Sequence, residues 1–152
     1  MSTAPEEPET VAPLKVGPAS LAVTSHTFAR ERTELVDIPG GSFDIVTVNG
    51  KTAYRFEEDD DNPTKVNCHG DCPITWPPVV VDGAEVTSLP GIDRGLVGTV
   101  KRPDGHLQVT YNGWPLYWFF KDKTPSDANG EGLGKNWSTI KADGKPVFKK
   151  KP

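Results

Sequence analysis

The sequence predicts an all-β fold: one domain in which two duplicated β-hairpin units pack as a pseudo-symmetric sheet, barrel or sandwich. Two observations carry this prediction. Glycine and proline, 15 residues each in 152, form a composition that breaks helices and favours short strands joined by turns. The dipeptide Asn-Gly also occurs twice between strand-like segments. It is the strongest short hairpin signal, because a type I′ turn needs positive φ at both central residues.

The segments follow in order along the chain. Residues 1–19 are rich in proline and glutamate and cannot bury a core, so we expect a flexible tether; a frayed terminus without a role is the alternative. Residues 20–34 include the apolar, β-branched run Leu21-Ala-Val-Thr and predict an added strand. We expect a first repeat over 35–95 and a second over 96–148. Residues 149–152 form a short basic tail.

The two repeats match residue by residue. The turn residues Asn49 and Asn112 lie 63 positions apart, and three more pairs share that spacing: Tyr54 and Tyr117, Phe56 and Phe119, and Asp59 and Asp122. The tryptophans Trp76 and Trp137 lie 61 apart. So many matches in the same order indicate an internal duplication of about 60 residues. Two repeats are too few for an open solenoid, so we expect them to pack on each other.

The two cysteines, Cys68 and Cys72, support two interpretations. A tight loop rich in glycine and proline can bring them to disulfide distance, which favours a structural disulfide in an oxidising compartment. Alternatively, the two thiolates with His69, and with the distant His106, would suit copper(I) or zinc. A redox-active disulfide is a third interpretation, although the usual Cys-x-x-Cys spacing is absent.

Two acidic segments are weaker candidates for calcium. The run Glu57-Glu58-Asp59-Asp60-Asp61-Asn62 offers hard oxygen ligands, but such a run is more often a solvated loop. Asp127-x-Asn129-x-Glu131-Gly132 copies the first half of a calcium loop. Its twelfth position is Ser138, so the bidentate carboxylate is missing.

Aromatic residues gather between positions 114 and 120. In a strand, alternation places Tyr117 and Phe119 on one face, which we assign to the core. Trp118 and Phe120 lie on the other face and, with Trp114, form a candidate surface for a partner. The alternative is that both faces are covered by the rest of the protein.

Several function classes are not expected. The net charge of −4 gives no basic field for nucleic acid. No run of 18 apolar residues is present to span a membrane, and no apolar segment near Met1 marks a signal peptide. We interpret the sequence as a mature exported segment with an added start methionine; a cytosolic protein is the alternative. The nucleophile, zinc-protease and nucleotide-binding motifs are absent, so we do not expect an enzyme.

The repeated residues resemble a known family. Tyr54-x-Phe56-x-x-Asp59 and Tyr117-x-Phe119-x-x-Asp122 are similar to the Tyr-x-aromatic-x-x-Asp signature of bacterial secreted-repeat lipoproteins. The Cys68–Pro78 segment also resembles the loop after that family's first copy. The resemblance covers roughly residues 35–148. It implies an exported protein, often lipid-anchored behind a polar tether, with no assigned activity and no catalytic residues to carry over.

These observations together predict a non-enzymatic cell-envelope protein that binds a partner or has a structural role. We expect no cofactor, and the partner would be an envelope protein or a small ligand. Any membrane association would come only from a lipid anchor upstream. The alternative is an extracytoplasmic protein that binds copper or another metal, or a redox cofactor for electron transfer, with an enzyme as a third hypothesis.

Overall fold

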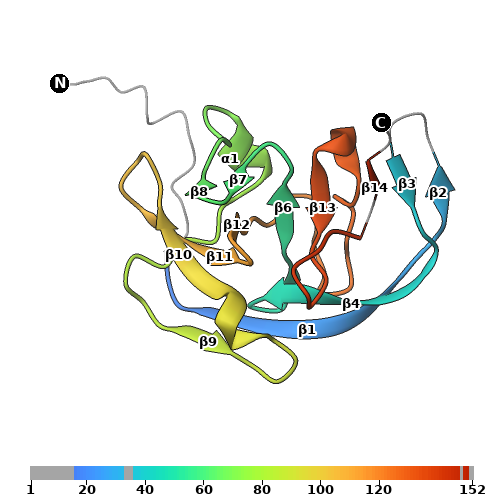
Figure 1. The fold of residues 1–152 in the computed structure, drawn as a ribbon, viewed down its shortest axis with the longest axis horizontal. Helices are drawn as coiled ribbons and strands as arrows, with labels where there is room; N and C mark the ends of the chain where they lie inside the picture. Colours follow the sequence, from blue (N-terminus) through green and yellow to red (C-terminus); the bar gives the residue numbers. More distant parts are fainter. Residues whose placement is uncertain (1–15, 33–35, 148, 151–152) are drawn as a thin grey trace.

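A computed structural model describes residues 16–32, 36–147 and 149–150 and confirms the all-β prediction. The described chain is built from short strands in several small sheets, with one short α-helix (Figure 1). No helix in the described part of the chain is long and apolar enough to cross a membrane. The internal duplication is present as two β-hairpin units.

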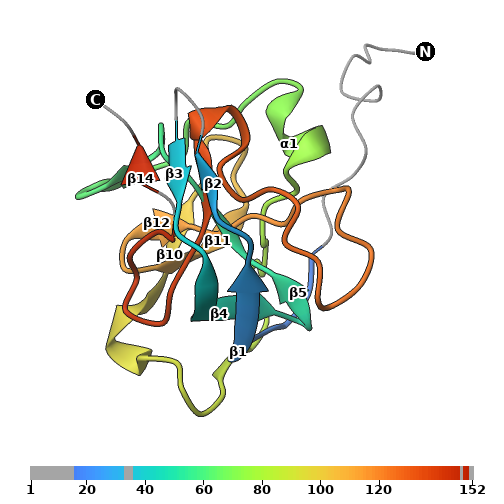
Figure 2. The same ribbon diagram turned by 90° about the vertical axis from the view of Figure 1, so that its right-hand side faces the viewer.

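The largest sheet has the strand order β5-β4-β1-β9. Its strands are β1 (Ala19–Phe28), β4 (Gly41–Val48), β5 (Lys51–Thr52) and β9 (Val86–Ser88). β1 pairs antiparallel with β4 from Leu21↔Val48 to Phe28↔Gly41, and pairs parallel with β9. The added strand predicted within 20–34 is therefore a central strand of this sheet. In Figure 2, β1, β4 and β5 lie at one end of the molecule and the helix α1 (Cys72–Thr75) at the other.

The second sheet repeats this arrangement with β10 (Val97–Lys101), β11 (Leu107–Tyr111) and β12 (Trp114–Pro115). β11 occupies the place of β4, and β10 the place of β1, because Val97 faces Tyr111 as Leu21 faces Val48. The predicted Asn-Gly turns join the strands of both hairpins. Their φ angles are 52° and 81° at Asn49-Gly50, and 53° and 82° at Asn112-Gly113, as a type I′ turn requires.

Short elements complete the fold. β6 (Tyr54–Phe56) pairs with β13 (Trp137–Thr139), and β7 (Asp60–Asp61) with β8 (Thr64–Lys65). β2 (Glu31–Arg32), β3 (Val36–Ile38) and β14 (Lys149–Lys150) form a third small sheet. Two 3₁₀ turns, η2 (Arg94–Leu96) and η3 (Leu133–Lys135), lie in loops.

Both predicted end segments differ in part from the structure. Most of the tether, residues 1–15, lies outside the described residues, but the stretch from Val16 belongs to the fold. The Gly17 N–H donates to the Val80 carbonyl at 3.2 Å, and β1 begins at Ala19. At the other end, Lys149 and Lys150 are not a free tail, because they form β14 and pair with β3.

The main core lies between the two hairpins. Each hairpin is bridged by an extended segment from the other half of the chain: the Val46 N–H donates to the Ile140 carbonyl, and the Val109 N–H to the Val79 carbonyl. Apolar side chains of both halves then pack together, namely Leu21, Val46, Val48, Val79, Val81, Val109, Tyr111, Leu116 and Ile140. Because both hairpins contribute to one core, neither repeat is an independent domain.

Candidate functional site

The two signature tyrosines meet where the repeats join. The Tyr54 N–H donates to the Tyr117 carbonyl at 2.8 Å, and the Tyr117 N–H donates back at 3.0 Å. Both tyrosines are fully buried. Residues 63 positions apart in sequence thus form one antiparallel bridge, which we call the seam.

The side chains at the seam are exchanged between repeats. The Tyr54 hydroxyl donates to Asp122 Oδ2 at 2.5 Å, and the Tyr117 hydroxyl donates to Asp59 Oδ2 at 2.7 Å. The second oxygen of each carboxylate accepts a backbone N–H: Asn67 donates to Asp59, and Asn129 to Asp122. Each signature aspartate is therefore bound by the tyrosine of the other repeat and by its own following loop.

Burial sets the protonation of these groups. It raises the pKa of the Asp59 carboxyl to about 6, although the Asn67 N–H, the Tyr117 hydroxyl and Arg102 favour the charged form. Burial, with the nearby aspartates, also raises the pKa of the Tyr54 and Tyr117 hydroxyls far above their ordinary value. At pH 7 both tyrosines are therefore protonated donors, and Asp59 is mostly ionised.

Four rings stack beside the tyrosines in the order Phe56, Trp137, Trp76, Phe119. The ring centroids are separated by 4.4, 3.8 and 4.3 Å, and the two indole planes differ by only 3°. Successive rings come from alternating repeats. The stack therefore joins the halves of the chain at the same place as the tyrosine–aspartate bonds, and all eight signature residues lie at the seam.

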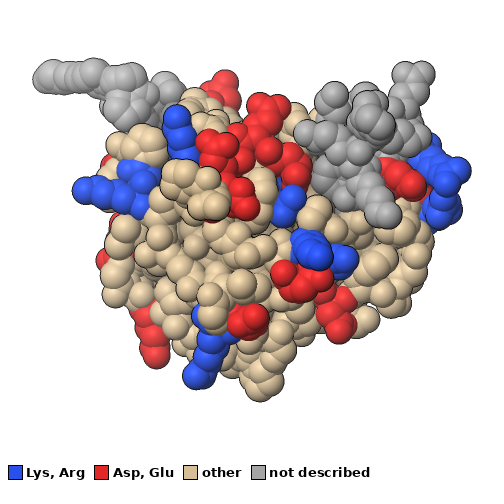
Figure 3. Space-filling view, viewed as in Figure 1, with Lys and Arg blue, Asp and Glu red and all other residues tan. Residues whose placement is uncertain are grey.

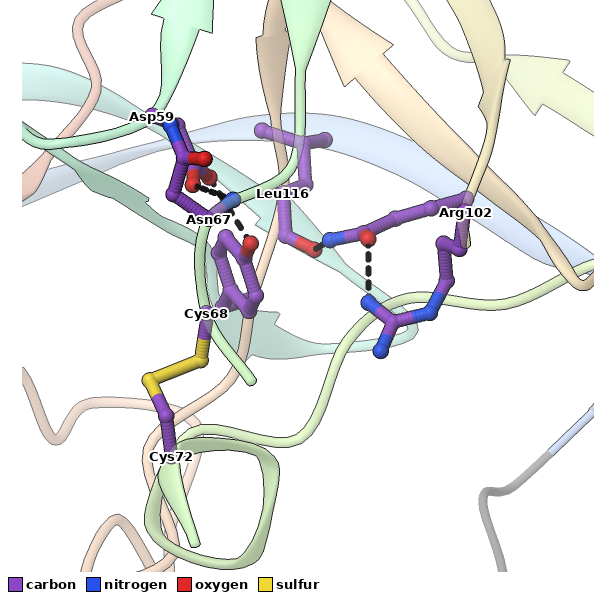
Figure 4. The surroundings of a disulfide bond; sticks show 8 residues. Asp59, Asn67, Cys68, Cys72, Arg102 and Leu116 are labelled. Atoms are coloured by element: carbon purple, nitrogen blue, oxygen red, sulfur yellow. Dashed lines mark hydrogen bonds between the residues drawn. A yellow bond between two sulfur atoms is a disulfide. The ribbon is translucent and has the colours of Figure 1, made fainter. Parts of the chain in front are cut away.

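A buried polar chain lies near Asp59 and was not predicted from the sequence. Arg102 Nη1 donates to Gln108 Oε1 at 2.7 Å, and Gln108 Nε2 donates to the Leu116 carbonyl at 2.7 Å (Figure 4). The Arg102 guanidinium also pairs with Asp104 at 3.1 Å. The Arg102 charge is thereby compensated in the interior, and it favours the ionised form of Asp59.

The predicted disulfide is confirmed. Cys68 and Cys72 are joined, with their Cα atoms 5.3 Å apart (Figure 4). Cys68 is fully buried at the seam, next to the aromatic stack. The bond closes the loop between the first signature aspartate and Trp76.

The structure does not assemble the alternative metal site. Both cysteine sulfurs are used by the disulfide, His69 is exposed, and His106 Nδ1 lies 2.7 Å from Asp82 Oδ2 instead. Within residues 16–32, 36–147 and 149–150, no three histidine, cysteine, aspartate or glutamate side chains are grouped to hold a metal ion. The structure thus brings Cys68 and Cys72 together but gathers neither His69 nor His106 with them into a ligand set.

The acidic candidates are likewise used by the protein itself. Glu57 pairs with Arg55 at 2.6 Å, and Asp59 points into the seam. Asp127 accepts the N–H groups of Lys123 and Thr124. The Glu131 carboxylate accepts the N–H and the hydroxyl of Thr139. Neither segment groups its carboxylates around one point in the described chain.

The three residues of the candidate partner surface lie in different surroundings. Trp114 is half-buried, with the Arg55 guanidinium 4.0 Å from its ring centroid. Trp118 packs against the main core, and its indole N–H donates to the Val48 carbonyl at 3.1 Å. Phe120 is 48% exposed. Of the three, Phe120 therefore contributes most to an open surface.

A shallow pocket of about 360 Å³ opens beside Phe120. Its lining comes from both repeats and includes both tryptophans of the stack: Thr75, Trp76, Phe119, Phe120, Lys121, Leu133, Gly134, Asn136 and Trp137. Leu133 is 43% exposed at its edge. The sequence indicated Phe120 and the tryptophans separately. It gave no sign of Leu133, because no pattern linked a loop 13 residues after Phe120 to that side chain, and Lys121 carried no signal beyond its place next to Phe120.

Comparison with known proteins supports the duplication. The profile of a family described as "secreted repeat of unknown function" matches residues 44–80 and again residues 98–141, together more than half of the chain. Searches of curated proteins and of solved structures gave no match. Each matched segment holds a β-hairpin, its signature tyrosine and one strand that crosses to the other repeat. The disulfide is consistent with an extracytoplasmic location. The chain therefore belongs to the lipoprotein family of secreted repeats, and carries two copies of the repeat.

Proposed function

We propose that this protein is a non-enzymatic binding domain of the cell envelope that holds an apolar, planar group in the pocket at the seam. The observation that carries the proposal is the pocket itself. Both repeats build it, four of its nine lining residues are aromatic, and Phe120 and Leu133 stay exposed at its edge. Exposed apolar side chains grouped around a concave site are typical of ligand or partner sites.

The polar groups of the seam support binding rather than acid–base chemistry. Asp59 and Asp122 are each held by a tyrosine hydroxyl and a backbone N–H in the interior, and neither lines the pocket. Lys121 is the one charged side chain among the lining residues. An apolar group that carries a negative charge, or an acceptor oxygen, would therefore fit this site best.

The cellular setting is part of the proposal. We infer an exported domain that a lipid anchor tethers to the membrane. The partner would be an envelope protein or a small ligand. Nucleic acid is not a proposed partner, because acidic and basic side chains are interspersed over the face in Figure 3. The proposal needs no cofactor.

A dye with the inferred chemistry tests the site. Anilinonaphthalene sulfonate combines fused rings with one negative charge, so its fluorescence should rise on binding to the folded protein. The double variant F120S/L133S should lose this rise, and so should K121E in larger part. Leu89 is 42% exposed but does not line the pocket, so L89S is the matched control and should behave as the wild type.

Dye binding by F120S/L133S is compared with dye binding by the control L89S. Equal dye binding by F120S/L133S and L89S would refute the pocket as the binding site. Urea unfolding of each variant should show that all of them are folded, since exposed apolar residues contribute little to stability. Indole N–H resonances offer a second readout: those of Trp76 and Trp137 should shift with dye, while that of Trp118, bonded to Val48, should not.

A further inference from the structure

The seam contains a continuous path of rings from the interior to the surface. Tyr54 packs edge-on against Trp76 with ring centroids 5.4 Å apart, and Tyr117 packs edge-on against Trp137 at 5.2 Å. The two indoles stack at 3.8 Å, and both line the pocket. Two buried phenols are therefore in van der Waals contact with an indole pair that reaches the surface. Electron transfer slows steeply with distance, so contact between rings is the most favourable case.

The stacked indoles are suited to losing an electron. Parallel rings at this separation can share one positive charge, which makes the pair easier to oxidise than a single indole. Phe56 and Phe119 cover the outer faces of the two indoles and shield them from water. Each indole is only 6% exposed, so an oxidant at the pocket would reach the pair at its edge.

Each seam tyrosine has a base placed for its proton. A phenol that loses an electron becomes a strong acid, so its oxidation is easiest when a base is hydrogen-bonded to it. Asp59 lies 2.7 Å from the Tyr117 hydroxyl and Asp122 lies 2.5 Å from the Tyr54 hydroxyl, both within the reach of a general base. The pKa of about 6 leaves Asp59 mostly ionised at pH 7 and ready to take a proton.

The third tyrosine, Tyr111, lacks both features. Its hydroxyl donates to the backbone carbonyl of Ala142, which cannot hold a proton, and no ring contact joins it to the indole pair among the described residues. The sequence has one methionine, Met1, which lies outside the described residues, and among the described residues no cysteine is free. Of the three tyrosines, Tyr54 and Tyr117 are thus the two that have both a carboxylate at the hydroxyl and an indole in ring contact.

We propose that the seam is a one-electron donor to oxygen-centred radicals that reach the pocket. The electron leaves the Trp76–Trp137 pair and reduces the radical, for example a peroxyl radical, to its anion. Tyr117 or Tyr54 then refills the indole pair, its O–H bond breaks, and the proton moves to Asp59 or Asp122. The products are a peroxide anion, a neutral tyrosyl radical and a protonated aspartate, so electrons and protons balance. This activity goes beyond the binding function and does not depend on it.

The test oxidises the whole protein with photogenerated tris(bipyridine)ruthenium(III) and follows the radicals by freeze-quench electron paramagnetic resonance. A tryptophan radical should form first and then give way to a tyrosyl radical. Y111F should behave as the wild type, whereas Y54F/Y117F should keep the tryptophan radical and lose the tyrosyl signal. A tyrosyl signal that persists in Y54F/Y117F and disappears in Y111F would overturn the proposal.

Two further variants test the path and the base. W76F/W137F keeps aromatic packing but should abolish rapid tyrosyl formation; an unchanged rate would overturn the route through the indoles. D59N/D122N keeps an acceptor oxygen but removes the bases. It should slow tyrosyl formation by about a hundredfold, the lower end of what a positioned base contributes. An unchanged rate would overturn the proton step.

One measurement needs no variant and covers the case in which a substitution unfolds the seam. Oxidation of the wild-type protein in the presence of a nitrone spin trap should place the adducts on Tyr54, Tyr117, Trp76 or Trp137, as mapped by mass spectrometry of peptides. Adducts found mainly on Tyr111 would overturn the proposal.

Discussion

The loops that follow the two signature aspartates occupy equivalent positions but are held in different ways. In the first repeat, Cys68 and Cys72 form a disulfide. In the second, Gly130 and Gly134 stand 62 positions later in their places. There the carboxylate of Glu131 accepts the Thr139 N–H at 2.8 Å and the Thr139 hydroxyl at 2.6 Å. A covalent bond in one repeat and a half-buried carboxylate in the other thus hold equivalent loops.

Both loops are fixed at the seam by equivalent residues. Both loops carry a tryptophan into the seam, and both donate a backbone N–H to the signature aspartate, from Asn67 in one and Asn129 in the other. Gly130 also lies under the Trp76 ring, where an added Cβ would come within 2.7 Å of it. The seam therefore constrains both loops in the same way, and the two loops differ in how they are tied.

The largest expected effect tests whether the two halves contribute equally to the seam. Trp76→Ala and Trp137→Ala should each lower the free energy of unfolding by about 3–5 kcal/mol, because each removes a ring packed between two others. Urea unfolding measures both, with Trp114→Ala as a control outside the stack that should cost less. A free energy of unfolding close to that of the wild type for either variant would show that the stack does not hold the repeats together.

The next effect tests the carboxylate tie of the second loop. Glu131→Ala should lower the free energy of unfolding by about 3 kcal/mol, since it leaves the backbone N–H and the hydroxyl of Thr139 without their acceptor. Glu58 is exposed and is the matched control, so Glu58→Ala should change stability by less than about 0.5 kcal/mol. Equal stabilities for the two variants would mean that Glu131 does not hold its loop.

Much of this comparison follows from the sequence, and the rest does not, for physical reasons. The turns at Asn49-Gly50 and Asn112-Gly113 are a local signal and the duplication of about 60 residues is a periodic one, and both are confirmed. The exchange of Tyr54 and Tyr117 between the aspartates of opposite repeats is not local. A fixed spacing shows that residues are equivalent, but it does not show which copy a side chain contacts.

Other features lacked any local signal. Arg102 stands in a Lys-Arg-Pro-Asp stretch that is typical of an exposed loop, yet it is 4% exposed and bonded to Gln108. Glu131 matched half of a calcium loop, whereas its carboxylate bonds to Thr139, eight residues later. β1 lies outside the repeated motif, so the sequence predicted an added strand and not the partner of β4. In each case tertiary contacts, rather than local pattern, decide the conformation.

The next prediction concerns how the stability of the protein depends on pH through Asp59, the signature aspartate of the first repeat. Its pKa in the folded state, about 6, lies above the usual value of 3.8, so the folded state binds the proton more tightly than the unfolded chain. Asp59 therefore contributes fully to the free energy of unfolding below about pH 4, and this contribution is lost as the pH rises through 6. The groups that act on it are Tyr117, Arg102, Asp60 and the Asn67 N–H.

The variant Asp59→Asn cannot titrate and isolates this effect. The stability of the wild type relative to this variant should fall by about 2–3 kcal/mol between pH 4 and pH 7, at roughly 1.4 kcal/mol per pKa unit. Urea unfolding of both proteins across this range provides the measurement. A relative stability that stays constant, or rises with pH, would mean that Asp59 is ionised throughout.

The smallest effect concerns the covalent tie. The free energy of unfolding of the double variant C68S/C72S should be lower by about 2 kcal/mol, because a disulfide that closes so short a loop restricts the unfolded chain only a little. Thermal unfolding of the wild type with and without a reductant should give the same loss. If Glu131→Ala lowers the free energy of unfolding as much as loss of the disulfide or more, two hydrogen bonds from Thr139 to one carboxylate hold the second loop as firmly as the covalent bond holds the first. A much larger loss in C68S/C72S than on reduction, which leaves both sulfurs in place, would instead show that the buried Cys68 sulfur contributes through packing against the aromatic stack.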